Sequence, residues 1–424
     1  MPTAVSDLPA YCRDLAQRAV AAGRTLSGAG GRLRTAALGC IADQIVQQAG
    51  SIQEANARDL TAGRDAGLSG ALLDRLRLDE PRIRTMADSV RQIAAQGDPV
   101  GQVLEGRVLP NGIRLQKVRV PLGVVFMIYE SRPNVTSDAA ALCVRSGNAV
   151  ILRGGKEAIH SNTAIAACVR AGLEAQGLDP DVVQLVATTD RAAVRELLHL
   201  EGLIDLAIPR GGESLIRAVA REARIPVIKH YHGNCHVYVD APCDPEAALE
   251  ICVNAKTQRP GVCNAAETIV FHRDAAESGL LAKICRALVE KKVQVRGDEA
   301  TCELFDQAQP AQEADWGTEY LDLIVAVRVV DSVEQAIEHI NRYGSKHTDA
   351  IVTTDLGAAD AFVRQVDSAN VFVNCSTRFS DGGEYGLGAE IGISTEKLHA
   401  RGPMGAADLT TYKWVAYGSG QVRT

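Results

Sequence analysis

The sequence predicts an α/β protein of two or three domains. Short runs rich in β-branched residues alternate with helical runs along much of the 424-residue chain. This pattern is typical of parallel sheets joined by crossover helices. Ala, Val, Leu and Gly are abundant, and aromatic residues make up only 4% of the chain, as suits a soluble α/β protein. A chain of this length usually forms about two or three domains. We therefore expect two α/β lobes, each built on its own sheet.

Charge and cysteine usage exclude several classes of protein. The net charge is −7 with both signs interspersed, so the sequence does not predict a basic surface that would bind nucleic acid. The eleven cysteines contain no C-x-x-C pair, which argues against a disulfide framework or a zinc knuckle and favours reduced thiols. The first residues lack the pattern of a secretory signal, and no segment approaches the roughly 18 apolar residues of a membrane span. We expect a cytoplasmic protein without membrane contact.

The first hundred residues are expected to be helical. Asp79 caps a helix with Pro81 in its first turn, and Gly97 ends it. Its apolar residues recur at helical spacing: Ile83, Met86, Val90 and Ile93. Beyond this region, Asn111-Gly112 joins two alternating runs at 102–120 and predicts a hairpin. A lone two-stranded ribbon is marginal, so we expect it to pack on something else, such as a neighbouring subunit.

Two sets of strands follow. The first set is expected at 124–129, 149–153, 182–186, 206–208 and 227–229. Between its strands, a crossover helix is expected at 161–176, capped by Ser161 and stopped by Gly177. The second set is expected at 237–239, 268–272, 293–296, 323–330, 350–353 and 371–374. Asp244-Pro245 opens a helix that runs to about Lys256.

That helix leads to the most informative residue of the chain, Cys263, on a Pro-Gly turn before a predicted strand. A thiol on such a turn is reachable by substrate, and only its thiolate attacks. The positive charges of Lys256 and Arg259 could increase the thiolate fraction. The alternative, a buried structural cysteine, stays open from the turn alone.

Several long motifs identify a family. They stand at 120–125, 128–136, 151–157, 208–213, 230–236, 254–272 and 379–392. Together they make the chain similar to the aldehyde dehydrogenase superfamily and, within it, to the γ-glutamyl phosphate reductases of proline biosynthesis. The resemblance implies an aldehyde dehydrogenase-like fold of two parallel-sheet lobes plus a small β oligomerisation element, in a homodimer or homotetramer. The segments that it implies are an NADP-binding domain (1–101 and 121–235), a catalytic domain (236–390) and the oligomerisation element (102–120 and 391–424).

The resemblance also implies catalytic roles. Cys263 would be the thiolate that attacks an acyl carbon, and Asn134 would supply the side-chain amide of the oxyanion hole. Preorganised donors of that kind typically contribute about 3–4 kcal/mol. The alternative for Asn134 is a turn residue after Pro133.

For the cofactor, the resemblance points to the turns that follow two strands. No G-x-G-x-x-G occurs there, so the dinucleotide would be held without the ordinary Rossmann fingerprint. Many NAD-using relatives carry an acidic residue at the place of Lys156, and a lysine there favours the 2′-phosphate of NADPH/NADP. The expected cofactor-binding residues are Arg153, Gly154, Gly155, Lys156, Arg210, Gly211, Gly212 and Glu319. Lys156 could instead be a solvated strand-end lysine, and Glu319 a solvated loop acid.

The implied reaction is the NADPH-dependent reduction of γ-glutamyl phosphate to glutamate 5-semialdehyde through a cysteine thioester, linked functionally to glutamate 5-kinase. Hydrolytic members carry a water-activating glutamate before the second lobe, whereas 223–239 contains no carboxylate. The doubly anionic substrate requires a cationic clamp, for which Arg132, Arg259 and Arg378 are candidates, unless each is a surface charge. The alternatives are a hydrolytic aldehyde dehydrogenase and a dinucleotide-binding protein without catalysis.

A metal site is a further alternative, because His230, His232 and His236 with Cys235 alternate as strand residues on one face would. Gly233-Asn234 indicates a turn that would splay them, and the resemblance gives them no metal role. We therefore expect no metal.

Overall fold

The computed structural model describes residues 5–423, which divide into two compact units. The first comprises Met1–Lys229, Gly386–Gly392 and Met404–Thr424, and the second comprises His230–Tyr385 and Ile393–Pro403. The boundary between the two units lies at 229/230, before the predicted domain boundary at 235/236. The predicted oligomerisation segment 391–424 is divided between the two units. Two contacts explain why 393–403 joins the second unit: Nδ1 of His230 lies 3.0 Å from the carbonyl oxygen of Ile393, and Arg401 pairs with Asp367 at 2.9 Å.

The first unit is built on a four-stranded parallel sheet in the order β5-β4-β3-β6. Its strands are β3 (Val124–Tyr129), β4 (Ala149–Gly154), β5 (Val183–Leu185) and β6 (Leu206–Arg210). The strand expected at 227–229 is wrong, since only a single parallel bridge joins Ala207 to Val227. The chain leaves this sheet for the second unit at Lys229, before a ladder can form.

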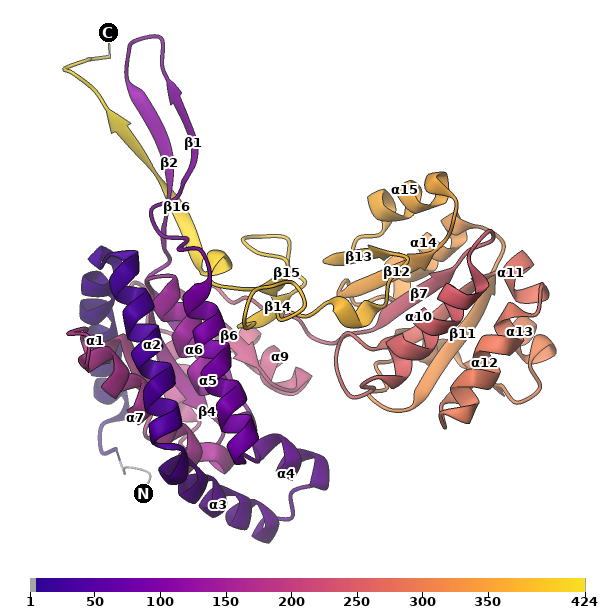
Figure 1. Ribbon diagram of the computed structural model, residues 1–424, viewed down its shortest axis with the longest axis horizontal. Helices are drawn as coiled ribbons and strands as arrows, with labels where there is room; N and C mark the ends of the chain where they lie inside the picture. Colours follow the sequence, from indigo (N-terminus) through magenta and orange to yellow (C-terminus); the bar gives the residue numbers. More distant parts are fainter. Residues whose placement is uncertain (1–4, 424) are drawn as a thin grey trace. The chain divides into compact units, whose positions relative to one another are not determined.

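Helices cover both faces of this sheet (Figure 1). They are α1 (Leu8–Gly28), α2 (Gly31–Gln47), α3 (Ala49–Asp65), α4 (Gly70–Leu76), α5 (Glu80–Ala95), α6 (Val135–Arg145), α7 (Ile159–Glu174), α8 (Ala192–Leu198) and α9 (Glu213–Glu222). Phe126 and Ile128 of β3 share a buried cluster with Leu15 of α1 and Leu197 of α8. On the other face α6 and α7 contact the strands, and α2, α3 and α5 pack on α6 and α7. Fully burying one such large apolar side chain contributes about 1.5–3 kcal/mol.

The starts of two helices differ in how well a local signal predicts them. The predicted start of α5 is confirmed, because the side chain of Asp79 accepts the backbone N–H of Arg82 at 3.0 Å. The predicted cap of α7 is wrong: Ala158 occupies that position, and Ser161 lies within the first turn. Ser161 is buried and donates its hydroxyl to Asp59 at 2.6 Å. Its polarity therefore serves a tertiary contact.

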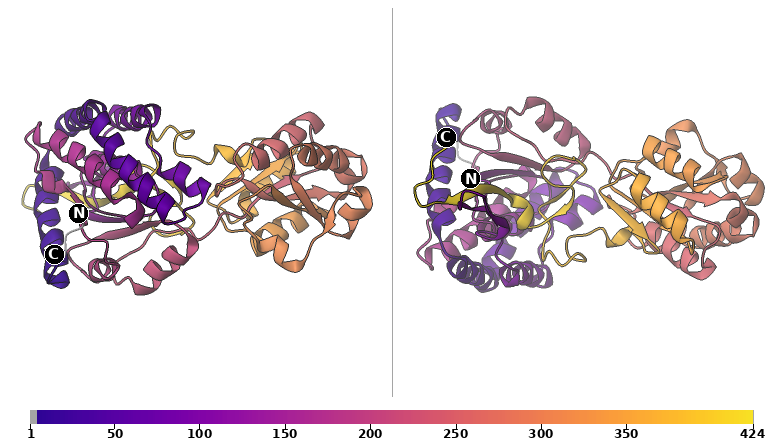
Figure 2. Two further views of the ribbon diagram at one scale, coloured as in Figure 1. Left: turned by 90° about the horizontal axis from the view of Figure 1, so that it is seen from below. Right: turned by 90° about the horizontal axis from the view of Figure 1, so that it is seen from above.

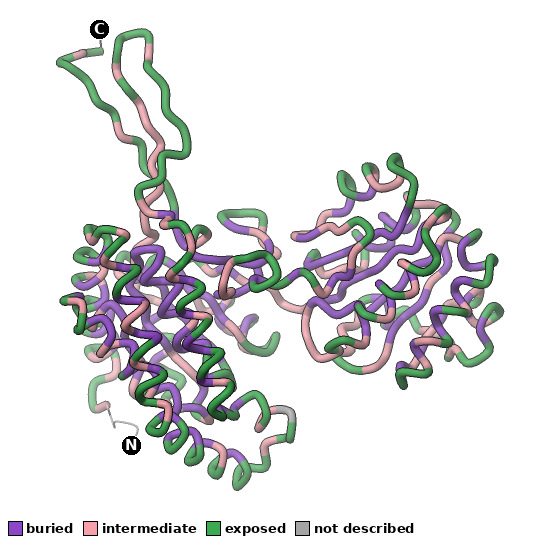
Figure 3. Tube along the Cα trace, in the orientation of Figure 1, coloured by how far each residue is buried: buried purple, intermediate pink, exposed green. Residues whose placement is uncertain are grey.

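Three antiparallel strands of the first unit form a separate ribbon with β2 in the middle. They are β1 (Val103–Val108), β2 (Arg114–Pro121) and β16 (Thr410–Tyr417). The predicted hairpin is confirmed, and Gly112 adopts φ +84° in its turn. Every residue of β1 is exposed, as are most residues of β16 (Figure 3).

The second unit is built on a seven-stranded sheet in the order β10-β9-β11-β8-β7-β12-β13, with all neighbours parallel. Its strands are β7 (Cys235–Val239), β8 (Ala266–His272), β9 (Gln294–Gly297), β10 (Gln309–Pro310), β11 (Ile324–Val330), β12 (Thr348–Val352) and β13 (Asn370–Val373). The short strands β14 (Gly392–Ser394) and β15 (Gly402–Met404) pair with each other.

Alternation along these strands places helices on both faces of the second sheet (Figure 2). The helices are α10 (Pro245–Thr257), α11 (Arg273–Glu277), α12 (Leu280–Glu290), α13 (Glu299–Leu304), α14 (Val333–Tyr343) and α15 (Leu356–Gln365). Val237 and Val239 pack in the cluster of α10–α12, while Tyr238 between them packs in the cluster of α14 and α15. The predicted α/β class with two parallel-sheet lobes is confirmed.

Candidate functional site

Cys263 lies half-buried on the turn between α10 and β8, as the sequence predicts. Asp244 caps α10 by accepting the N–H of Glu246 at 2.9 Å. Two side-chain contacts fix the turn itself: the Asn264 amide donates to the carbonyl of Ser380 at 2.8 Å, and Thr377 donates to the carbonyl of Asn264 at 2.8 Å. The thiol is thus held in place and reachable by solvent.

Gly233 packs directly on the backbone of Cys263. A Cβ at position 233 would lie 1.9 Å from the carbonyl oxygen of Cys263, so only glycine fits. The N–H of Gly233 donates to Oε1 of Glu319 at 2.8 Å. Glu319, expected to bind the nicotinamide ribose, therefore lies beside the backbone that supports the cysteine.

Two imidazoles share the surroundings of the thiol. One ligand atom each from His230, Cys263 and His347 lie within 4.8 Å of one another. The rings of His230 and His347 meet edge to face, with centroids 5.7 Å apart. The sequence did not predict His347 as a site residue. It lies near Cys263 because β12 pairs with β7, and no local sequence pattern indicates that pairing.

The four residues weighed as a metal cluster do not gather. His236 is buried and its Nδ1 lies 3.0 Å from Oδ1 of Asp349. The Cys235 thiol donates to the carbonyl of Cys263 at 3.2 Å. Of that set, His230 shares the group of possible ligand atoms with Cys263, and the sulfur of Cys235 lies 3.7 Å from Nδ1 of His347.

One of the three predicted substrate arginines, Arg378, lies near Cys263, and a second, Arg259, lies near Arg378. Burial lowers the pKa of Arg378 and Arg259 lowers it further, whereas its interactions with Asp381 and Cys263 oppose this shift. Nε of Arg378 donates to Oε1 of Gln258 at 2.8 Å, just after α10. Arg132, the third candidate, is an exposed residue of the first unit.

The expectation that Lys256 assists the thiol is corrected by its pairing. Nζ of Lys256 lies 2.5 Å from Oε2 of Glu267, and both side chains are fully buried. Burial lowers the pKa of Lys256, and it raises the pKa of Glu267 to about 7 against the opposing charge of Lys256. The lysine charge is thus matched by a strand carboxylate, whereas Arg378 lies close enough to Cys263 to interact with it.

In the first unit, Asn134 occupies the turn before α6. Its amide donates to Oδ2 of Asp138 at 2.8 Å. Burial raises the pKa of Asp138 to about 6, and the Asn134 hydrogen bond opposes that shift. The structure therefore orients the Asn134 amide through a carboxyl group one helical turn away.

The predicted cofactor turns meet at one edge of the first sheet. Tyr129, the last residue of β3, is in register with Gly154 on one side and with Arg210 on the other. The strand order reverses direction at β3, and parallel sheets bind nucleotides outside the carboxyl ends of their strands at such a point. Residues from both predicted turns are therefore at the expected edge.

Side chains of the protein occupy part of these turns. The N–H of Gly212 donates to Oε2 of Glu130 at 3.1 Å, and the same carboxylate lies against Gly211. Glu157 lies over Gly155 in a similar way and accepts the N–H of Ser131 at 2.7 Å.

The predicted cofactor-binding cations at this edge differ in their exposure and in the groups that they contact. Arg210 pairs with Glu390 at 3.0 Å, and both side chains are mostly buried. Arg153 donates to the carbonyl oxygens of Gly154 and Thr189. Lys156 is exposed in the short 3₁₀ turn that precedes α7.

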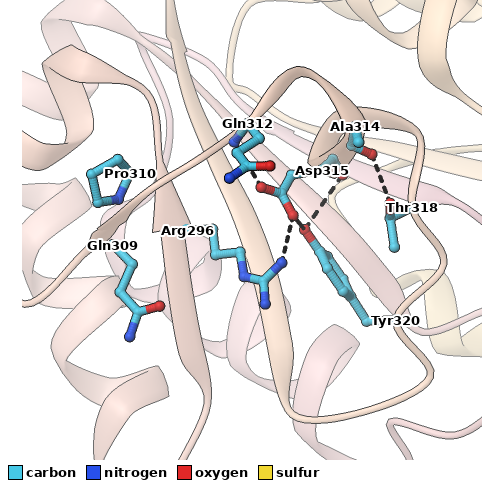
Figure 4. A pocket seen from close by; sticks show the side chains of 8 residues that line it. All are labelled: Arg296, Gln309, Pro310, Gln312, Ala314, Asp315, Thr318 and Tyr320. Atoms are coloured by element: carbon cyan, nitrogen blue, oxygen red, sulfur yellow. Dashed lines mark hydrogen bonds and ion pairs between the residues drawn. The ribbon is translucent and has the colours of Figure 1, made fainter.

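A separate hollow of the second unit is lined by segments between positions 296 and 320 (Figure 4). Its charges are matched internally, because Asp315 accepts from Arg296 at 2.6 Å and from the hydroxyl of Tyr320 at 2.8 Å. None of the predicted site residues lines it.

Within the described residues, no helix has the length and apolarity needed to cross a bilayer.

Comparison with known proteins identifies the family. The aldehyde dehydrogenase family model matches residues 16–315. A γ-glutamyl phosphate reductase of Moorella thermoacetica is 54% identical over 407 residues, which cover 96% of this chain and 97% of the relative. The crystal structure of the Thermotoga maritima γ-glutamyl phosphate reductase matches with a TM-score of 0.95 and 43% identity, covering 97% of this chain and all of that one. The corresponding Saccharomyces cerevisiae structure matches with a TM-score of 0.55 and 31% identity, covering 97% and 98%. The chain therefore belongs to the aldehyde dehydrogenase family and, within it, to the γ-glutamyl phosphate reductases.

Proposed function

We propose that this enzyme uses NADPH to reduce γ-glutamyl phosphate to glutamate 5-semialdehyde and phosphate, through a thioester on Cys263. The observation that carries the proposal is the half-buried Cys263 thiol on a fixed turn, with two imidazoles and Arg378 around it. The names of the relatives supply the substrate.

In the proposed reaction the thiolate of Cys263 attacks the acyl carbon, and the bond from that carbon to the phosphate oxygen breaks. Inorganic phosphate leaves with the electron pair. NADPH, when bound, supplies the hydride that reduces the thioester carbon. The resulting thiohemiacetal loses its proton and expels the sulfur, which releases the aldehyde. The imidazoles beside the sulfur can accept and return protons.

Charge stabilisation falls to two groups of residues. The oxygen of each tetrahedral intermediate would accept hydrogen bonds from the Asn134 amide and the Cys263 N–H. Arg259 and Arg378, with Arg132, would hold the phosphate and the α-carboxylate.

Two carboxylates of the second unit near the cysteine turn are held by other groups of the protein, which supports reduction over hydrolysis. Glu267 is paired with Lys256, and Glu319 accepts the N–H of Gly233. No carboxylate lies in 223–239. Because the segment lacks the carboxylate that activates water in hydrolytic relatives, we expect the thioester to survive until hydride transfer.

The decisive assay oxidises glutamate 5-semialdehyde with NADP in the presence and absence of phosphate. We expect strictly phosphate-dependent NADPH formation, because phosphate must displace the cysteine from the thioester in this direction. Acid formation without phosphate would instead establish a hydrolytic aldehyde dehydrogenase. Cofactor binding without any turnover would establish a dinucleotide-binding protein.

Lys156 should determine the cofactor preference. Replacing it by glutamate removes a positive charge from the 2′-phosphate and adds a repulsive one, so we expect kcat/KM for NADPH to fall by about 10–100-fold. The value for NADH should change little. Steady-state kinetics with both cofactors check this, and equal losses for the two would contradict the assignment.

We further propose that the first unit binds the cofactor, the second carries the nucleophile and the three-stranded ribbon joins subunits into a homodimer or homotetramer. Tyr412, Trp414 and Tyr417 are each about half exposed on the edge strand β16, and exposed edges of this kind need covering. A monodisperse monomer in light scattering would contradict the assembly.

Eleven free thiols suit a reducing cytoplasm, where glutamate 5-kinase would supply the acyl phosphate.

A further inference from the structure

We propose that Cys263, His230 and His347 also form a zinc site, in which Zn²⁺ binds the nucleophilic sulfur and reversibly blocks it. The site itself stands on the geometry of the three side chains. Its inhibitory consequence rests on the proposed role of Cys263.

The donor atoms are those that zinc prefers. One sulfur and two imidazole nitrogens match a Cys-His-His set, with a fourth position left for water. The three atoms lie within 4.8 Å of one another. With Zn–S near 2.3 Å and Zn–N near 2.0–2.1 Å, tetrahedral ligand atoms lie roughly 3.3–3.6 Å apart. Side-chain rotations that draw the atoms together by about 1 Å would complete the site.

Hydrogen bonds already orient both imidazoles as metal ligands. A carbonyl oxygen only accepts, so Nδ1 of His230 donates to Ile393 at 3.0 Å. The hydroxyl of Thr348 donates to Ser380 at 2.9 Å, so it accepts from Nδ1 of His347 at 2.8 Å. In each neutral ring the lone pair is thereby on Nε2. Zinc-binding histidines characteristically donate their other nitrogen to such an oxygen.

The three ligand residues differ in solvent exposure. His347 is buried directly before β12, whereas His230 and Cys263 are half-buried, so an ion can enter from their side. Arg378 adds positive charge near Cys263, which weakens the binding of a cation. We therefore expect a weaker, reversible inhibitory site in place of a permanent structural one. Cys235 donates its hydrogen to the carbonyl of Cys263 and does not complete the ligand set.

Cobalt titration tests the site without any assay of activity. The intact enzyme, freed of metal with EDTA, is titrated with Co²⁺, and a thiolate-to-cobalt charge-transfer band with visible tetrahedral bands is expected. The charge-transfer band should vanish in Cys263→Ala. Binding should weaken about 100-fold in His230→Gln and His347→Gln, since even residues that only support metal ligands cost 10–100-fold.

The matched controls are His232→Gln, two residues from His230, and Cys302→Ser, a partly buried thiol of the same unit. Both should bind cobalt as the parent does, and circular dichroism of every variant reports folding. Zn²⁺ should also slow alkylation of Cys263, read by peptide mass spectrometry, and EDTA should restore it. A missing charge-transfer band in the parent enzyme, or unchanged binding in both folded histidine variants, would overturn the site.

The two proposals can fail separately. If cobalt binds as expected but the enzyme shows no phosphate-dependent turnover, the zinc site stands and the proposed reaction is wrong. If turnover is phosphate-dependent but indifferent to Zn²⁺, and no cobalt band forms, the reaction stands and the zinc site is wrong.

Discussion

Alanine at position 263 is expected to reduce phosphate-dependent turnover by about 10⁴-fold or more while the enzyme stays folded. The sulfur is the only part of this side chain that can form the acyl bond, so its removal eliminates the route through a thioester. The substitution removes one half-buried atom, and half-buried positions away from a packed core usually change stability by about 1 kcal/mol or less. Turnover and thermal unfolding, measured on the same preparation, check both parts.

Cys302→Ser serves as the control, because this thiol is also partly buried in the second unit but lies on α13. It should retain turnover. Enzyme trapped with γ-glutamyl phosphate in the absence of NADPH should carry an acyl group on the peptide containing Cys263. Acylation of another cysteine, or substantial turnover by Cys263→Ala, would contradict the thioester mechanism.

The fold was largely predictable because its strands and helices have local signals. Asp79 and Asp244 both cap the helices that they were expected to cap. The errors arose where a tertiary contact overrode the local pattern. Ser161 resembles a cap but binds Asp59, which lies on another helix. The run at 227–229 resembles a strand, but the chain leaves the sheet before it can pair.

The residues of the candidate site also differ in whether a local sequence pattern predicts them. The position of Cys263 was predictable because a cysteine on a turn between helix and strand is a local feature. His347 was not, since it reaches the thiol only through the order of strands in the second sheet. The pairing of Lys256 could not be predicted for the same reason. Its position near the cysteine is visible in the sequence, but its ion pair with Glu267 depends on how α10 packs on β8.

That ion pair supports the second large effect. Lys256→Met should lower the free energy of unfolding of the second unit by about 3–5 kcal/mol, because it leaves a fully buried carboxylate without its partner. The double variant Lys256→Met, Glu267→Gln should recover part of this loss. Urea unfolding can be followed through Trp316, a buried residue of the second unit, in a Trp414→Phe background that removes the other tryptophan.

The dependence on pH separates loss of the ion pair from a simple packing defect. The folded pKa of Glu267, about 7, lies above its ordinary 4.5, so between these values the folded state binds more protons than the unfolded state. The contribution of Glu267 to stability is therefore greatest below about pH 4.5 and falls as pH rises through 7. Without Lys256 the carboxyl group resists ionisation still more strongly, so the deficit of Lys256→Met should be larger at pH 8 than at pH 5. In the double variant this difference should disappear, because glutamine does not titrate. An equal deficit at both pH values would show that Lys256 contributes through packing, with the charge of Glu267 playing no part.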